Sequence, residues 1–175
     1  MATVGIAKII SEKAPNVWKA SMLTMDKTQS LEIIKKELFF CTNEYFYGRS
    51  RPYVQTFVCQ HPQYQWPLCF DLRHDPKPYL NMPLKELEAA MKKQPKFIRT
   101  VRHNKHPVIM NPSYGDKFDE YKIIGLTKLK ERAEMVRKNK NFVEKIQSIK
   151  RSEVEEKEQS KSQEDLYNEE SIYAK

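Results

Sequence analysis

The 175-residue chain lacks features that would place it in several large classes of protein. Its three cysteines, Cys41, Cys59 and Cys69, include no CxxC pair and lie in apolar runs, which argues against a structural zinc site and a disulfide framework. No stretch approaches the roughly 20 apolar residues of a spanning helix, and the N-terminus lacks a signal-peptide pattern. We therefore expect buried thiols and a cytoplasmic protein.

The charge balance is strongly basic. The chain has 31 Lys and Arg against 23 Asp and Glu, a net charge of +8, with pI ≈ 9.3 and mean hydropathy −0.75. This balance favours a polyanionic partner, most commonly nucleic acid, although small basic proteins also exist that are merely soluble. The length suits one domain, or one domain with helical additions.

A basic stretch from Phe97 to Pro112 is the most informative part of the chain. It begins with a strand-like pattern in which Ile98 and Val101 are apolar and their neighbours are basic. It then turns and ends on the apolar run 108–110. We expect one face of this strand to enter a core while the other presents cations to an anion, namely Arg99, Arg102 and Lys105.

Three helices are predicted before the first strand. The apolar run 4–10 suits a buried helix that Pro15 ends, and Pro15 itself suits the first turn of a second helix. Asp26 is placed to cap a third helix that contains Leu31 and Ile34.

The middle of the chain predicts a small sheet. Residues 38–47, 51–58 and 65–72 have strand composition, and Pro52 suggests an edge position for the second of these strands. Together with the strand at Phe97 they predict a small barrel-like sheet. Pro83 begins a predicted helix.

The last third predicts two helices and a charged extension. Thr127 is the expected cap of the first helix, and apolar residues recur at helical spacing in both. Residues 151–163 have almost no apolar side chains, which predicts a solvated helix or a disordered linker. The predicted core positions are Leu129, Ala133, Val136, Phe142, Ile146 and Ile149.

The order of several weak motifs resembles bacterial exonuclease I. VRHNKHPVIMN is similar to the turn that joins its nuclease body to a helical arm, and ATVGIAKII to the helix that closes its nuclease domain. RPYVQTFVCQHPQ, WPLCFDLRHDP and LKELEAAM resemble its SH3-like strands and helix, while LTKLKERAEMV and NFVEKIQ resemble the helices that follow.

The resemblance implies an α+β fold, in which a small antiparallel SH3-like β-barrel is flanked by N-terminal helices and a C-terminal helical arm. It divides the chain into nuclease-domain helices (1–37), the SH3-like domain (38–116) and the start of the helical arm (117–175).

The resemblance also implies a role in 3′→5′ degradation of single-stranded DNA during repair and recombination. The family uses acidic residues that bind two Mg²⁺ ions, which stabilise the attacking and leaving oxygens, with a His as general base. The last of these acids precedes the helix that ATVGIAKII resembles, so none has a counterpart here. We expect a chain that binds DNA without cutting it, either a gene fragment or one part of a split enzyme paired with a separate nuclease-domain chain.

Other sites for chemistry are weaker candidates. Asp71, His74 and Asp75 lie close together and suggest an acid–base pair, although such a cluster is more often structural. His61, or His103 with His106, suggest metal ligands, but the spacing supplies no third ligand and favours turn structure and phosphate contact.

Binding to nucleic acid has more support. Cations supply phosphate contacts that are independent of base sequence, and tyrosines stack on unpaired bases when they are not packed in a core. The stacking candidates are Tyr45, Tyr47, Tyr53 and Tyr64. The predicted basic surface consists of Arg49, Arg51, Arg99, Arg102, His103, Lys105 and His106.

The resemblance implies a second partner, the acidic tail of single-stranded DNA-binding protein. By position, Arg51 and Asn111 match a basic and an amide residue of the family's tail pocket, and its main arginine falls at Lys117 or Lys122. The alternative to the whole exonuclease hypothesis is a free-standing basic adaptor that binds RNA or protein.

Overall fold

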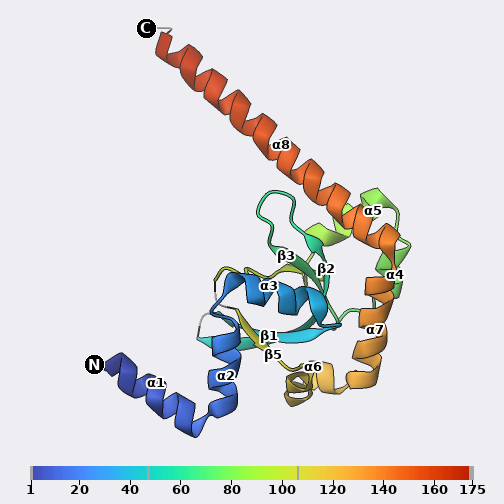
Figure 1. The fold of residues 1–175 in the computed structure, drawn as a ribbon. Coiled ribbons are helices and arrows are strands. Elements are labelled where there is room, and N and C mark those ends of the chain that lie inside the picture. Colours follow the sequence, from blue (N-terminus) through green and yellow to red (C-terminus); the bar gives the residue numbers. More distant parts are fainter. Residues whose placement is uncertain (1, 47, 106, 174–175) are drawn as a thin grey trace.

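A computed structural model describes residues 2–46, 48–105 and 107–173. Three helices come first: α1 (Ala2–Lys13), α2 (Pro15–Leu23) and α3 (Lys27–Lys36). The middle contains β1 (Phe40–Phe46), β2 (Arg49–Gln60), β3 (Pro67–Asp71), α4 (Lys77–Leu80), α5 (Leu84–Lys92), β4 (Ile98–Thr100) and β5 (Val108–Met110). The chain continues through η1 (Pro112–Lys117), α6 (Asp119–Lys122), α7 (Leu126–Lys138) and α8 (Lys140–Tyr173) (Figure 1).

The fold is α+β, as expected, and its five strands form one antiparallel sheet in the order β4-β3-β2-β1-β5. This architecture is compatible with an SH3-like domain. The expectation of a closed barrel is wrong, because in the described residues β4 and β5 are opposite edges and form no ladder with each other. Each has only three residues, and the turn between them carries the chain from one edge to the other.

Helices cover both faces of the sheet. On one face Phe40, Cys69 and Ile109 pack against Ile34 of α3. The opposite face packs in a single core with the helices that follow, and α3 is seen lying along the sheet in Figure 1. Side chains alternate between two faces along a strand, so this two-sided cover follows from the register. The core of the opposite face includes Val54, Leu68, Phe70, Leu129, Phe142 and Ile146.

The two C-terminal helices match the sequence in their buried positions. All six predicted core residues of α7 and α8 are at most 3% exposed. The cap is different, because α7 begins at Leu126 and is preceded by Gly125 at φ 79°, so Thr127 is already helical. α8 continues as a helix through residues 151–163 and extends away from the body (Figure 1), which confirms the helical alternative for that segment.

The N-terminal helices are confirmed, but their predicted burial is not. Asp26 caps α3, and its Oδ1 accepts hydrogen bonds from the backbone N–H of Thr28 at 2.6 Å and of Gln29 at 3.2 Å. In α1, by contrast, Val4 is 75% exposed and Ile6 is 58% exposed. The helix packs mainly on α2, which covers little of its apolar surface.

Two further details bear on earlier expectations. β2 lies between β1 and β3, so the predicted edge position is wrong for the strand as a whole. Pro52 pairs with Asn43 of β1, in a part of β2 that extends beyond the pairing with β3, which begins at Gln55. The missing N–H of proline is therefore tolerated there.

The three cysteines are buried and unpaired, as expected. Burial raises the pKa of the Cys41 thiol to about 11 and of the Cys59 thiol to about 12. No helix in the described part of the chain is long and apolar enough to cross a bilayer.

Candidate nucleic-acid interface

The register of the sheet places three predicted arginines on one face. Arg49, Arg51 and Tyr53 alternate along β2, and they pair with every second residue of β1, including Glu44 opposite Arg51. Arg99 of β4 reaches the same face through its pairing with β3. This part of the face continues the surface that α3 covers.

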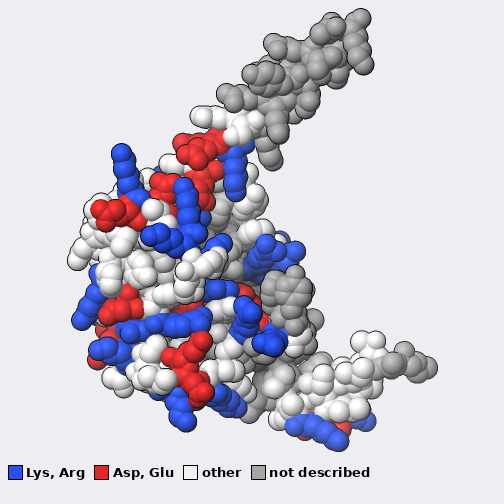
Figure 2. Space-filling model, turned by 180° about the vertical axis from the view of Figure 1, so that it is seen from behind, with Lys and Arg blue, Asp and Glu red and all other residues white. Residues whose placement is uncertain are grey.

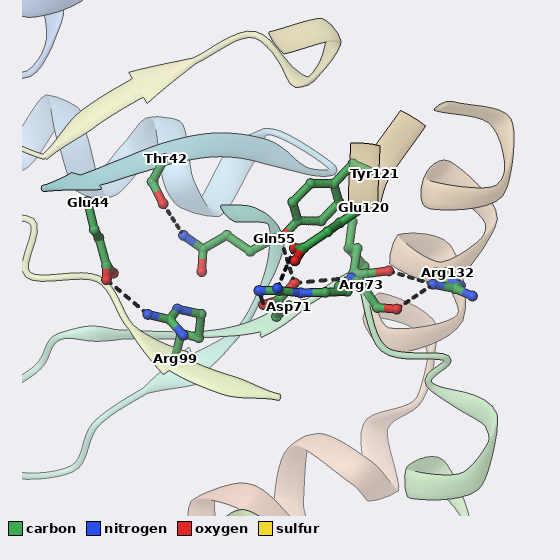
Figure 3. Close-up of polar contacts among 10 residues, drawn as sticks. Thr42, Glu44, Gln55, Asp71, Arg73, Arg99, Glu120, Tyr121 and Arg132 are labelled. Atoms are coloured by element: carbon green, nitrogen blue, oxygen red, sulfur yellow. Dashed lines mark hydrogen bonds and ion pairs between the residues drawn. The ribbon is translucent and has the colours of Figure 1, made fainter. Parts of the chain in front are cut away.

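Arg99 is held tightly on that face. Its guanidinium carbon lies 3.4 Å from the centroid of the Tyr53 ring, and Nη2 donates to a carboxylate oxygen of Glu44 at 2.9 Å (Figure 3). The Arg99 side chain is 20% exposed. Tyr53 is buried beneath it, which is the core-packing alternative rather than a free stacking surface. Glu44 also neutralises part of the charge that a polyanion would meet.

The other predicted cations lie in the turn after β4. Val101 anchors this turn, because it is buried and its N–H donates to the Pro67 carbonyl at 2.9 Å. Arg102 and Lys105 are exposed beyond it. Burial lowers the pKa of His103, and the positive charges of Lys27 and Lys35 in α3 lower it further.

The predicted surface is thus two groups of cations with Arg99 between them. Arg49 and Arg51 lie at the start of β2, whereas the turn lies at the opposite end, beside Pro67, which pairs with Gln60. His106 and Tyr47 fall outside the described residues, and the Tyr45 side chain is likewise not described. In Figure 2, which shows the molecule from behind, Lys and Arg alternate with Asp and Glu without a field of one sign.

The acid–base candidate at residues 71–75 belongs to a buried network. Tyr121 Oη donates to Asp71 Oδ1 at 2.9 Å, and the Arg73 guanidinium donates to Oδ2 at 3.0 Å and also pairs with Glu120 (Figure 3). Asp71 is fully buried. The nearby His74 ring packs edge-on against Tyr79, and burial lowers its pKa. Asp71 and His74 are thus engaged by neighbouring side chains, so they do not form an open catalytic pair.

A column of flat side chains occupies the β2–β3 turn. The ring centroids of His61 and Tyr64 lie 4.9 Å apart, and those of Tyr64 and Trp66 lie 4.7 Å apart at an interplanar angle of 22°. The Arg102 guanidinium carbon lies 5.1 Å from the Trp66 ring. Sequence reasoning named Tyr64, Arg102 and His61 but missed Trp66; the signal was an aromatic residue two positions after Tyr64 at the start of a strand.

Comparison with solved structures identifies the fold. It is similar to that of exonuclease I. The enzyme from Methylocaldum szegediense matches with a TM-score of 0.67 and 18% identity over 84% of this chain. The E. coli enzyme in complex with a dT13 oligonucleotide matches with a TM-score of 0.64 and 15% identity over 85% of this chain. A structure of SSB/exonuclease I matches with a TM-score of 0.65 and 17% identity over 85%.

This chain corresponds to about a third of those proteins. It covers 35% of the M. szegediense and E. coli exonuclease I chains and 34% of the chain in the SSB/exonuclease I structure. No protein-family model matches the chain, and no curated protein sequence matches it either. The similarity to exonuclease I therefore concerns the fold.

The residues expected to form an exonuclease I-like tail pocket lie apart. Asn111 follows β5, which pairs with β1 at residues 41–43, while Arg51 pairs with Glu44 on the far side of β1. This register separates them by two strands and by roughly 13 Å along the strands. The Asn111 side chain accepts a hydrogen bond from the Ser113 N–H at 3.0 Å. The tail pocket stays a prediction.

The two Mg²⁺ ions that the sequence resemblance implies do not fit the described residues. Across the described ranges, no three His, Cys, Asp or Glu side chains come together in a way that could hold a metal ion. Asp71 is fully buried, and its carboxylate already accepts hydrogen bonds from Tyr121 and Arg73. We therefore derive no metal-dependent step from these side chains.

Proposed function

We propose that this chain is a single-stranded DNA-binding accessory region, SH3-like plus helical, of an exonuclease I-like 3′→5′ exodeoxyribonuclease that acts in DNA repair and recombination. The observation that carries this proposal is the match of 84–85% of the chain to exonuclease I structures, one of which contains a dT13 oligonucleotide. The net charge of +8 supports a polyanionic partner as well.

The proposed contact to phosphates uses exposed cations on both sides of Arg99. Arg102 and Lys105 lie in the exposed turn, and Arg49 lies at the start of β2. Arg51, His103 and Arg99 complete the proposed set, with Arg99 and His103 held more deeply than the others. Such contacts position a strand without reading its sequence.

We assign catalysis to a nuclease domain outside this chain. We propose that the acids which bind Mg²⁺ belong to a separate nuclease domain, and that this chain alone is inactive. The exposed apolar side chains of α1, including Val4, Ile6 and Ile9, support a packing partner for that helix. We further propose the acidic tail of single-stranded DNA-binding protein as a partner of Arg51 and Asn111, on the precedent of the SSB/exonuclease I structure.

Salt-dependent binding to oligo(dT) tests the DNA-binding part. Neutralising the turn in an Arg102→Ala/Lys105→Ala variant should weaken binding and make the log–log salt slope shallower by about 1.4, since each phosphate contact on a single strand contributes about 0.7. A matched control, Lys128→Ala/Lys130→Ala, removes the same charge from the exposed side of α7. If both variants change the slope equally, the turn has no special role.

A nuclease assay tests the assignment of catalysis. The purified chain should leave 3′-labelled and 5′-labelled single strands intact in the presence of Mg²⁺. Processive degradation from the 3′ end would contradict the proposal. Tighter binding to an RNA oligomer than to DNA would favour the adaptor function instead.

A further inference from the structure

Arg102 differs from Arg99, although each lies over an aromatic ring. The Arg99 guanidinium lies over the Tyr53 ring and forms an ion pair with the Glu44 carboxylate, and its side chain is largely buried. The Arg102 guanidinium lies over the Trp66 ring, but the residue is exposed, and within the described residues it forms no ion pair. Because the residue is exposed, its planar guanidinium is accessible to a ligand.

The β2–β3 turn that holds Trp66 beneath Arg102 is ordered by its own hydrogen bonds. The His61 N–H donates to the Trp66 carbonyl at 2.8 Å, and the Gln65 N–H donates to the His61 carbonyl at 2.9 Å, which closes the turn. Gln65 adopts φ 56°, a left-handed conformation that is uncommon outside glycine. The Gln65 side chain donates to the Pro62 carbonyl at 2.8 Å and holds that conformation. The Tyr64 and Trp66 rings are thus stacked, with the His61 ring tilted against Tyr64, before any ligand arrives.

We propose that Arg102 is a stacking surface for one unpaired base, which adds to the column of His61, Tyr64, Trp66 and Arg102. The inference rests on the proposed function, because its ligand is single-stranded DNA, and it assigns Arg102 a contact with a base in addition to a phosphate. Bases stack on guanidinium planes as well as on aromatic rings. An arginine already resting on tryptophan loses little further freedom when a base covers its other side.

A cationic hollow beside the column is suited to the neighbouring phosphates. A cavity of about 560 Å³ adjoins the turn through Gln65, which separates Tyr64 from Trp66 in the chain. Lys35 and Arg151 supply its positive charge. Lys35 lies in the last turn of α3, so this hollow extends from the end of that helix to the β2–β3 turn. A strand whose base lies on Arg102 would thus have cations beside its backbone.

A comparison of oligo(dT) with an abasic DNA oligomer distinguishes binding through base stacking from binding through phosphate charge. Binding of the full chain is measured by fluorescence anisotropy with oligo(dT) and with an abasic oligomer of equal length at the same salt concentration. Arg102→Lys keeps the charge but removes the plane. It should weaken oligo(dT) binding at least about five-fold, the lower limit for loss of one stacked base, and leave abasic binding within about two-fold.

A second variant tests the role of Trp66. Trp66→Leu should produce the same loss that is specific to base-containing oligomers, and the Arg102→Lys/Trp66→Leu double variant should lose little more than either alone, because the two side chains act as one unit. Circular dichroism checks that each variant is folded.

Each outcome is decisive. If the wild-type chain binds neither oligomer, the proposed function fails together with the inference. If the wild-type chain binds both, and Arg102→Lys changes neither or changes both equally, the stacking role is overturned while DNA binding stands. A Trp66→Leu variant that folds and keeps full oligo(dT) affinity would likewise overturn the inference.

Discussion

At the scale of single residues, several arginines hold the molecule together instead of facing solvent. The Arg137 guanidinium of α7 donates to the carbonyl of Lys35 at 2.9 Å and to Thr56 Oγ1 at 3.0 Å, so it joins the end of α3 to β2. Arg132 donates to the carbonyls of Leu72 at 2.7 Å and Arg73 at 2.9 Å (Figure 3). Cations satisfy helix-end carbonyls well, as Arg137 does at the end of α3. Part of the net charge of +8 is therefore used internally.

The hydrogen bond from Tyr121 to Asp71 should matter for stability. Tyr121→Phe leaves a fully buried carboxylate with one donor fewer, and we expect a loss of about 1–3 kcal/mol in the free energy of unfolding. Urea denaturation measures it. Tyr64→Phe, at a side chain that is 49% exposed, is the control and should change stability by less than about 0.5 kcal/mol. Equal effects of the two variants would contradict the role of the network.

The partly buried His74 should make the fold less stable in mild acid. Burial lowers the pKa of His74 from 6.5, so the unfolded state binds its proton more readily. Stability should therefore be lost as the pH falls below about 6.5, which unfolding at about pH 7.5 and about pH 5.5 measures. His74→Gln should reduce the difference without removing it, because burial also lowers the pKa of His61 and His103. An unchanged difference would exclude His74 as a contributor.

At the scale of secondary-structure elements, a close approach between η1 and β2 positions the helices that follow. Gly115 of η1 is buried, and a Cβ there would lie 2.6 Å from Val54 Cγ2. Val54 is itself completely buried in the sheet, so it has no room to move away. The absence of a side chain at Gly115 lets η1 lie directly on β2.

Two glycine substitutions should therefore have opposite effects. Gly115→Ala should destabilise the chain by about 1–3 kcal/mol through overpacking against Val54. Gly5→Ala, in α1 where a Cβ would meet nothing within 4 Å, should stabilise the chain by roughly 0.5–1 kcal/mol. Thermal unfolding compares them. A neutral Gly115→Ala variant would mean that η1 is able to move off the sheet.

At the scale of the whole molecule, the two ends of the chain leave the body in different ways. α8 extends from it as a long helix (Figure 1) that is rich in charged residues. The exposed side chains of α1 include apolar ones. Val17 of α2 is also 50% exposed. Apolar surface of this kind is typical of an interface, which agrees with the proposed nuclease-domain partner.

Association in solution should follow from α1. We expect the wild-type chain to self-associate when no partner is present, and Val4→Lys to shift it towards monomer because the exposed apolar surface is interrupted. Sedimentation velocity measures the change. Thr3→Lys adds the same charge at an exposed polar position of the same helix and should have little effect. A wild-type chain that is monomeric at every concentration would contradict the expectation.

Features that depend on local spacing were predictable. The apolar positions of α7 and α8 follow the helical repeat, and Asp26 caps α3 as its position indicates, because both depend on residues within one or two turns. The strands of the middle region were predicted for the same reason. Helix caps that use no side-chain hydrogen bond were not predictable. The N-cap of α7 is Gly125, whereas the sequence had indicated Thr127.

The amino-acid sequence alone determined the order of the longer helices and of the first four strands, the basic charge and the buried faces of the last two helices, since these depend on composition and short-range periodicity. Only the tertiary structure decided that the sheet stays open and that Arg99 is neutralised by Glu44, 55 residues away. It also decided that the exposed Arg102 lies over the Trp66 ring. Pairings between distant residues depend on how strands cross in space, and no local pattern encodes that.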